Sequence, residues 1–254
     1  MSILRIAHLY PDLLNLYGDK GNVLTLTKRL EWRGIEFIFD EITVAEHNKR
    51  FSDYHLFFIG GGQDSGQTIV AKDLLSRKQE MIDVVEAGAT VLSICGGYQL
   101  LGKTYETSEA QIIEGLGILD VETRAPKIVA GKTQDRLIGN VTAELLINLE
   151  PRTLVGFENH SGRSYIRDKV LGVGTLPLAK IIHGYGNNAE DGTEGAYYKN
   201  LFGTYLHGSL LPKNPHFADE LLRRALIYSG SSMILDPLDD KLELRAHRAA
   251  IGLK

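Results

Sequence analysis

The first hundred residues alternate short apolar runs with segments in which apolar residues recur at helical spacing. The apolar runs, which predict buried strands, cover 4–10, 35–42, 54–59 and 90–94. Helical spacing over 22–33 and 67–87 predicts helices that end at glycines. Strands that are apolar on both faces and alternate with helices are typical of a parallel sheet covered on two sides. We therefore predict a doubly wound, mostly parallel α/β sheet of the flavodoxin or Rossmann type, with helices on both faces.

The second half of the chain follows a different pattern. Between 103 and 199 the helical period fades, and short β-like pieces lie among glycines and polar turns, which predicts extra strands and loops. The α/β pattern returns with a strand at 201–206 and a helix over 215–229, which begins with a proline after the capping residue Asn214. We expect a main domain over 1–230. The charged residues after it predict a C-terminal helical extension over 231–254, either docked or free.

Composition and charge narrow the class of protein. The 254 residues are 43% apolar and 24% charged, which suits one large α/β domain. Lys and Arg total 28 against 32 for Asp and Glu, so the net charge of −4 argues against a nucleic-acid partner. A single cysteine is typical of a reducing compartment, and no apolar stretch approaches the roughly 20 residues that span a bilayer. The sequence therefore predicts a cytoplasmic protein without a transmembrane segment.

The only cysteine, Cys95, stands between the predicted strand 90–94 and the glycine pair Gly96-Gly97. A buried strand that delivers a nucleophile into a glycine-assisted turn at the start of a helix is a nucleophile elbow. A thiolate at such a position gains from the positive end of the helix dipole. A lone thiol is more often a buried apolar group. The elbow context nevertheless favours a catalytic nucleophile.

A second glycine turn, Gly60-Gly61-Gly62, ends the predicted strand 54–59. In a parallel sheet this turn opens at the same edge as Cys95. A thiolate that attacks an acyl carbon needs N–H donors for the developing oxyanion, each worth about 2.7–4 kcal/mol in rate. The Gly61 and Gly62 turn and Gly96 are the candidate donors. A triple glycine alone is equally typical of a tight turn or of phosphate binding, so its pairing with Cys95 is what favours an oxyanion site.

A cysteine nucleophile also needs a base and proton donor, usually a histidine that the fold brings close. Among eight histidines, His207 ends the predicted strand 201–206 and so returns to the edge that holds Cys95. His160, which also follows an apolar strand into a polar turn, is the second choice. Most histidines are surface or structural groups, so context alone leaves His207 a hypothesis.

These residues resemble the class I, triad-type glutamine amidotransferases, in the branch shared with cobyric acid synthase, whose nucleophile lies in a Cys-Gly-Gly-Tyr-Gln segment, here 95–99. Further matching segments are 15–22, 58–62, 115–117, 156–160, 184–188 and 198–208. Gly-Tyr-Gly-Asn-Asn at 184–188 and Tyr-Leu-His-Gly at 205–208 narrow the resemblance to the glutaminase subunits of lipid II isoglutaminyl synthases. The resemblance covers roughly 4–228.

The resemblance implies a reaction and a set of roles. Cys95 attacks the carboxamide of L-glutamine, ammonia leaves, and water hydrolyses the thioester while His207 shuttles protons. Arg136 matches an arginine that holds glutamine, and Gln99 is expected near the substrate. A guanidinium suits a free α-carboxylate, although an exposed arginine is commonly just a solvated charge.

The resemblance also implies a heterodimer. Its partner is a MurT-like, ATP-dependent ligase of the Mur-ligase family, which amidates the D-glutamate of the lipid II stem peptide to D-isoglutamine in the peptidoglycan of a Gram-positive cell wall. We expect no cofactor in this chain and place ATP and magnesium on the partner, because the sequence has no Gly-x-x-x-x-Gly-Lys-Ser/Thr loop.

One position departs from the triad pattern. Triad amidotransferases carry a glutamate two residues after the histidine, and here that position is Ser209. An imidazole without an orienting carboxylate loses part of its catalytic power. The carboxylate must therefore come from elsewhere in this chain, with Glu158 an early candidate, or from the partner, which the resemblance favours.

Three alternative functions stay open at this point. The chain can serve a cobyrinate-type synthetase with the same glutamine chemistry. It can be a peptidase-like cysteine hydrolase that uses Cys95 and His207 without a preference for glutamine. It can also be a non-catalytic binding module, for which Ser209 is the only support.

Overall fold

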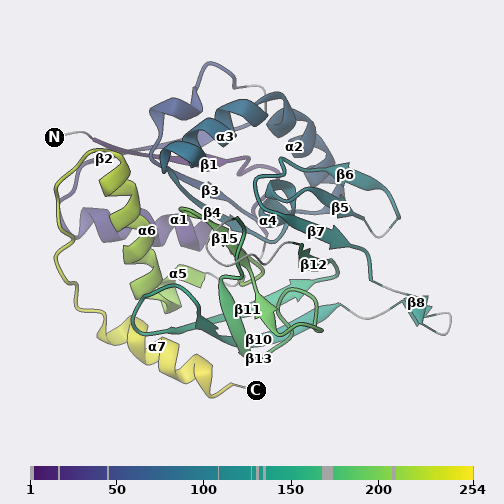
Figure 1. Ribbon diagram of the computed structural model, residues 1–254. Coiled ribbons are helices and arrows are strands. Elements are labelled where there is room, and N and C mark those ends of the chain that lie inside the picture. The colour runs from purple at the N-terminus through teal and green to yellow at the C-terminus, as the bar shows by residue number, and fades with distance from the viewer. Residues whose placement is uncertain are drawn as a thin grey trace.

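A six-stranded sheet forms the centre of the molecule (Figure 1). The computed structural model describes residues 3–253 except 17, 45, 108, 127, 130–131, 134–135, 168–173 and 208–209. The strand order is β15 (Ala196–Tyr198), β16 (Leu201–Thr204), β4 (Thr90–Ile94), β3 (Leu56–Ile59), β1 (Leu4–Leu9) and β2 (Phe37–Ile42). All neighbours pair in parallel except β15, which is antiparallel to β16.

The two central strands, β3 and β4, are buried at every position. Helices α1 (Lys20–Glu31) and α6 (Pro215–Tyr228) cover one face of the sheet, and α2 (Asp64–Ser76) and α3 (Lys78–Ala87) cover the other (Figure 1). Coverage on both faces explains why these strands are buried at every position rather than at alternate positions. The predicted doubly wound α/β fold is therefore confirmed.

One predicted helix is wrong in detail, because 67–87 is divided between α2 and α3 at Arg77. The Arg77 guanidinium lies 3.5 Å from the centre of the Phe51 ring, in the short 3₁₀ turn η1 (Phe51–Asp53), and donates to the carbonyl of Lys49 at 2.6 Å. These contacts bury a long charged side chain against the core. Helical spacing alone gives no sign of such an anchor.

The second half of the chain forms two further four-stranded sheets, as the prediction of extra strands requires. One sheet contains β11 (Thr153–His160), β10 (Leu137–Leu145), β13 (Ala179–His183) and β14 (Thr193–Glu194). The other contains β12 (Arg163–Ile166), β7 (Val121–Arg124), β5 (Thr104–Glu106) and β6 (Ile112–Glu114). A two-stranded ribbon joins β8 (Ile128–Val129) to β9 (Lys132–Thr133).

Three short helices complete the structure: α4 (Gly96–Leu101), α5 (Leu210–Lys213) and α7 (Lys241–Ile251). The last of these is docked, since His247 Nε2 lies 2.8 Å from Thr153 Oγ1 and its Nδ1 lies 2.8 Å from the carbonyl oxygen of Lys213. Asp240, just before α7, pairs with the buried Arg29 of α1 at 2.6 Å. The division of the chain at 230 stays a prediction. Within the described part of the chain, every helix is too short or too polar to cross a bilayer.

Candidate active site

Three strand ends meet at the carboxyl edge of the central sheet. Ile59 pairs with Ser93, and Thr204 pairs with Ile94, so β3, β4 and β16 end at the same level. The turns that follow these strands carry Gly61, Cys95 and His207. The parallel register therefore brings together residues that lie far apart in the sequence, as expected from their strand ends.

Cys95 has the backbone geometry of a nucleophile elbow. Its φ of 48° and ψ of −103° lie where side chains are rarely tolerated, and it occupies the cap position of α4. Its N–H donates to the carbonyl of Thr204 at 2.9 Å, which ties the elbow to β16. Such a conformation costs about 1–3 kcal/mol and persists only where the surroundings hold it. The thiol is 9% exposed and lines a cavity.

Gly61 lies between the side chains of His207, Cys95 and Asp19. A Cβ added there would lie 2.7 Å from His207 Cε1, 3.3 Å from Cys95 Cβ and 3.4 Å from Asp19 Oδ2. These distances show that the three side chains surround one backbone position. Only glycine fits this position without displacing the histidine.

Asp19 is the residue that sequence reasoning missed. It is fully buried, its Oδ1 lies 3.4 Å from His207 Nδ1, and its Oδ2 accepts the Gly61 N–H at 2.7 Å. It immediately precedes α1, where an aspartate ordinarily caps the helix, yet its side chain makes no capping hydrogen bond. The signal in the sequence was its place in the matching segment 15–22.

His207 is fully buried and fixed by backbone pairing with β11. Its N–H donates to the Phe157 carbonyl at 2.8 Å, and the Phe157 N–H donates back at 3.3 Å. Burial disfavours the charged ring, but the negative charges of Cys95 and Asp19 outweigh burial and raise the pKa of His207 from 6.5 to about 10. The geometry therefore favours an imidazolium beside the sulfur at neutral pH, the form that stabilises a thiolate.

The three predicted oxyanion donors have different surroundings. The Gly61 N–H is already bonded to Asp19, so it is directed away from the substrate. The backbone nitrogen of Gly62 lies 3.1 Å from where a Cβ on Gly96 would be, so these two turns approach closely beside Cys95. Gly62 and Gly96 thus remain the predicted donors, whereas Gly61 holds the turn in place.

A cavity of about 510 Å³ opens over Cys95. Its lining includes Arg136 and Asn159 on one side and the turn at Gly62 and the start of α2 on another. Arg136 Nε donates to Asn159 Oδ1 at 3.0 Å, and its Nη2 donates to the Asn159 carbonyl at 2.9 Å. This pair of bonds fixes one edge of the guanidinium and leaves its Nη1 end for an anion. Asn159 was not predicted, because its role depends on the pairing of β10 with β11.

Gln99 does not face the cavity. Its side chain is buried, and Nε2 donates to the Tyr205 hydroxyl at 3.1 Å. The expectation that Gln99 lies near the substrate stays a prediction. One helical turn after Cys95 carries it about 5.4 Å along α4 and into the interior.

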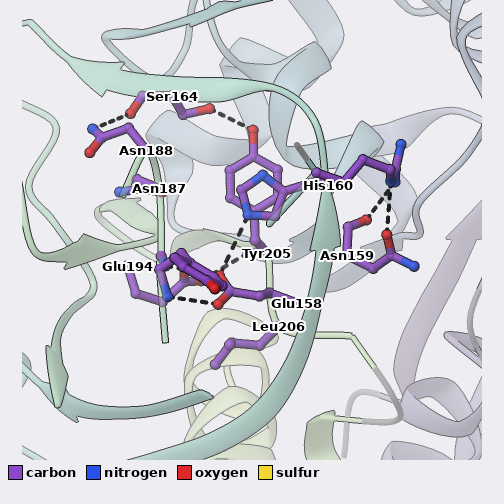
Figure 2. Close-up of polar contacts among 12 residues, drawn as sticks. Glu158, Asn159, His160, Ser164, Asn187, Asn188, Glu194, Tyr205 and Leu206 are labelled. Atoms are coloured by element: carbon purple, nitrogen blue, oxygen red, sulfur yellow. Dashed lines mark hydrogen bonds and ion pairs between the residues drawn. The ribbon is translucent and has the colours of Figure 1, made fainter. Parts of the chain in front are cut away.

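His160 and Glu158 form a separate buried group (Figure 2). The His160 ring stacks on Tyr205 at a centroid distance of 3.6 Å, and its Nδ1 lies 2.8 Å from the Gly162 carbonyl oxygen. Glu158 accepts the N–H groups of Tyr185 and Gly186 at 2.7 and 2.8 Å. Glu158 is thus occupied in anchoring a loop, and Asp19, not Glu158, is the carboxylate beside His207. His160, the second choice as base, is likewise committed elsewhere, and Ser209 lies outside the described residues.

The chain belongs to the CobB/CobQ-like glutamine amidotransferase domain family, which matches residues 5–215. It is 41% identical to the Staphylococcus aureus lipid II isoglutaminyl synthase (glutamine-hydrolyzing) subunit GatD, over 99% of this chain and 96% of that one. It is 38% identical to the Streptococcus pneumoniae protein of the same name, over 88% of this chain and 80% of that one.

The fold has solved counterparts as well. The structure of PurLQS from Thermotoga maritima aligns with a TM-score of 0.57 and 16% identity over 90% of this chain and 99% of that one, which shows a shared fold. Together with the family match, this confirms the predicted resemblance and identifies the chain as a glutamine amidotransferase. The individual roles of the site residues stay predictions.

Proposed function

We propose that this chain is the glutaminase subunit of a lipid II isoglutaminyl synthase. The observation that carries the proposal is the geometry of Cys95 on a strained turn beside His207, with Arg136 lining the same cavity as the thiol. The relatives that are 41% and 38% identical carry that name, and the chain spans most of the length of each. The cobyric acid synthases that match this chain are 27–35% identical to it, and the matches cover at most 40% of their own length, so the support for a cobyrinate-type acceptor is weaker.

The reaction follows from the placement of these groups. The Cys95 sulfur bonds to the side-chain carbonyl carbon of glutamine, while the N–H groups of Gly62 and Gly96 stabilise the oxyanion. The His207 imidazolium gives its proton to the departing nitrogen, and ammonia leaves a γ-glutamyl thioester. Water then gives a proton to His207 and its hydroxyl to the acyl carbon, which releases glutamate and restores the thiolate beside the imidazolium. The sum is glutamine plus water to glutamate plus ammonia.

Arg136 selects the substrate in this scheme. Its positive charge faces the cavity that holds the thiol, where the α-carboxylate of glutamine pairs with the guanidinium end that Asn159 leaves accessible. A peptide-bonded glutamine has no such carboxylate. A cysteine hydrolase that cleaves peptides would not need this arginine, so the geometry argues against that alternative.

The partner completes the biological function. We propose a MurT-like ligase that binds ATP, magnesium and lipid II, receives the ammonia and amidates the D-glutamate of the stem peptide. The relatives' description as a synthase subunit supports a second chain. The whole reaction would take place at the cytoplasmic side of peptidoglycan synthesis.

Glutamate release and nitrogen transfer test this proposal. The chain should be incubated with [amide-¹⁵N]glutamine, a MurT-like ligase, ATP, magnesium and lipid II, and compared with the Cys95→Ala variant. We expect the label to appear in the stem-peptide amide with the native chain, and Cys95→Ala to lose all measurable glutamate release. Glutaminase activity that survives in Cys95→Ala would overturn the mechanism. Transfer to cobyrinate but not to lipid II would favour the alternative acceptor.

A further inference from the structure

We propose that Glu194 is a positioning residue for the glutaminase reaction. Its carboxylate holds the segment that joins β16 to His207 and, through Thr204, the turn that carries Cys95. The inference rests on the proposed function. It also gives a role to the Gly-Tyr-Gly-Asn-Asn segment at 184–188, which narrows the family resemblance but does not line the cavity over Cys95.

The chain between β16 and His207 leaves the central sheet and needs other acceptors for its N–H groups. β16 ends at Thr204. The next N–H, that of Tyr205, donates to Glu194 Oε1 at 2.8 Å (Figure 2). The N–H of Leu206 donates to Thr204 Oγ1 at 3.0 Å, and this hydroxyl donates in turn to the same carboxylate oxygen. One buried carboxylate oxygen therefore holds both residues that precede His207.

The same segment supports the nucleophile. The Cys95 N–H donates to the Thr204 carbonyl at 2.9 Å, so the elbow takes its position from the residue that Glu194 holds. The φ of Cys95 is 48°, and such a conformation persists only where its surroundings fix it. Glu194 itself is fully buried and does not line the cavity. It therefore acts on the sulfur and the imidazole through the backbone at the end of β16, not by contact with glutamine.

The position of Glu194 is fixed from the other side by Asn187, in the segment 184–188. Asn187 Oδ1 accepts the Gly195 N–H at 3.0 Å, and its Nδ2 donates to the Gly195 carbonyl at 2.9 Å. Gly195 has a φ of 61°, and a Cβ there would lie 2.4 Å from the Gly203 carbonyl oxygen in β16. The turn after Glu194 is thus packed directly against the strand whose end the carboxylate holds.

A purely structural role explains the carboxylate less well. A backbone N–H and a hydroxyl can be satisfied by a neutral acceptor, whereas a buried carboxylate is costly to remove from water. Glu158 on β11 adds a second negative charge, which increases that cost. An ionised acceptor makes hydrogen bonds about twice as strong as a neutral one. These stronger bonds, which keep the end of β16 in place, offset the cost of the charge.

The strength of this support depends on pH. Burial, with a smaller contribution from the charge of Glu158, raises the pKa of Glu194 from 4.5 to about 7, although the bonds that it accepts act in the opposite direction. Tyr98 of α4 and Tyr205 stay neutral, because burial raises the pKa of each phenol, and the residue paired with Glu194 on β13 is the uncharged Ala179. Glu194 therefore gains its charge, and its bonds strengthen, as the pH rises through 7.

The test uses the complex with the MurT-like ligase and compares Glu194→Ala with Glu194→Gln, which keeps the acceptor and removes the charge. We expect kcat for glutamate release, per folded molecule, to fall about 10- to 10²-fold in Glu194→Ala, since a misplacement near 1 Å costs the larger figure. Glu194→Gln should lose about fivefold at pH 8, because its bonds are weaker but still made. KM should stay within about threefold in both variants, because Glu194 does not line the cavity.

The matched control is Glu190→Gln, which removes the same charge from an exposed position in the same loop and should stay within about twofold of the native kcat. Circular dichroism of each complex gives the folded fraction to which kcat is referred.

A second readout separates positioning from mere folding. The ratio of the native kcat to that of Glu194→Gln should fall from about fivefold at pH 8 toward one at pH 6, because protonated Glu194 resembles the neutral amide. A carboxylate that only stabilises the fold gives a ratio that does not depend on pH. If Glu194→Ala folds poorly, Thr204→Val removes the hydroxyl between the carboxylate and Leu206, and we expect its kcat to fall about three- to tenfold.

The outcomes are distinct. A kcat in Glu194→Ala within about threefold of the native value, or a Glu194→Gln variant as slow as Glu194→Ala, would overturn the inference. A ratio that stays constant between pH 6 and 8 would overturn it as well, as would a native-like kcat in Thr204→Val where that variant replaces Glu194→Ala. A native complex that releases no glutamate would instead show that the proposed function is wrong.

Discussion

The parallel sheet and the antiparallel sheet of this chain contribute different halves of one site. The parallel sheet carries the residues proposed for the chemistry, because Gly61, Cys95 and His207 all follow strands that end at one edge. The antiparallel pair β10 and β11 carries Asn159 and adjoins Arg136, the residues proposed to recognise the substrate, and it also holds the His207 backbone through Phe157. The residues proposed for the chemistry thus follow buried strands of the parallel sheet, and the residues proposed for substrate selection lie on or beside the antiparallel pair.

The largest effect on activity is expected when a glycine at the edge of the parallel sheet is replaced by alanine. A glycine in the antiparallel sheet serves as the control. Gly61→Ala should lower glutaminase activity at least about 10²-fold, because its Cβ would lie 2.7 Å from His207 Cε1, and a misplacement near 1 Å costs that much. Gly139→Ala, in β10, meets nothing closer than 4.0 Å and should stay within about twofold. Initial rates of glutamate release check both variants. Equal losses in the two would contradict the division of roles.

A smaller effect is expected from the recognition side. Arg136→Ala should lower kcat/KM for L-glutamine about 10²-fold, and Asn159→Ala about three- to tenfold through KM, because bonds to charged groups contribute about 1.5–3 kcal/mol. The slow reaction with 4-aminobutanamide, which lacks the α-carboxylate, should be unaffected by either change. Steady-state kinetics with both amides measure this. A parallel loss on the two substrates would show that these residues only support the fold.

The smallest effect concerns pH and stability. The pKa of His207 is raised from 6.5 to about 10, so its ionisation stabilises the folded chain fully below pH 6.5 and loses that contribution as the pH rises toward 10. The native chain should therefore exceed His207→Gln in unfolding free energy by a margin that shrinks between pH 6.5 and 10. Denaturant unfolding at pH 6, 8 and 10 measures the margin. In a Cys95→Ala background this stability margin should begin to shrink at lower pH, because one source of the raised His207 pKa is gone. A margin that grows with pH would refute the raised pKa of His207.

The sequence predicted the chemical half of the site better than the recognition half. The apolar run at 54–59 and the β-forming segment at 90–94 predict buried parallel strands, and such strands fix which residues share an edge. The positions of Cys95 and His207 follow from that rule. The family resemblance, rather than spacing, pointed to Arg136, because the short strands of the second half have no comparable pattern.

The residues that were missed depend on contacts that no local pattern encodes. Asp19 reaches His207 because the loop after β1 folds back over the sheet edge. Asn159 meets Arg136 through the register of β10 with β11, which pairs Ile138 with Asn159. Nearness in sequence to Cys95 does not give the direction of a side chain on α4, where Gln99 lies buried beside Tyr205, and its place near the substrate stays a prediction.

The positive φ of Cys95 limits which mutations the chain tolerates without loss of activity. A sulfur held on a contorted backbone is reactive only while β3 and β16 clamp the strand between them, so mutations that loosen those flanking strands would silence the enzyme before they unfold it. Changes in the packing of these strands are therefore restrained by activity as well as by stability.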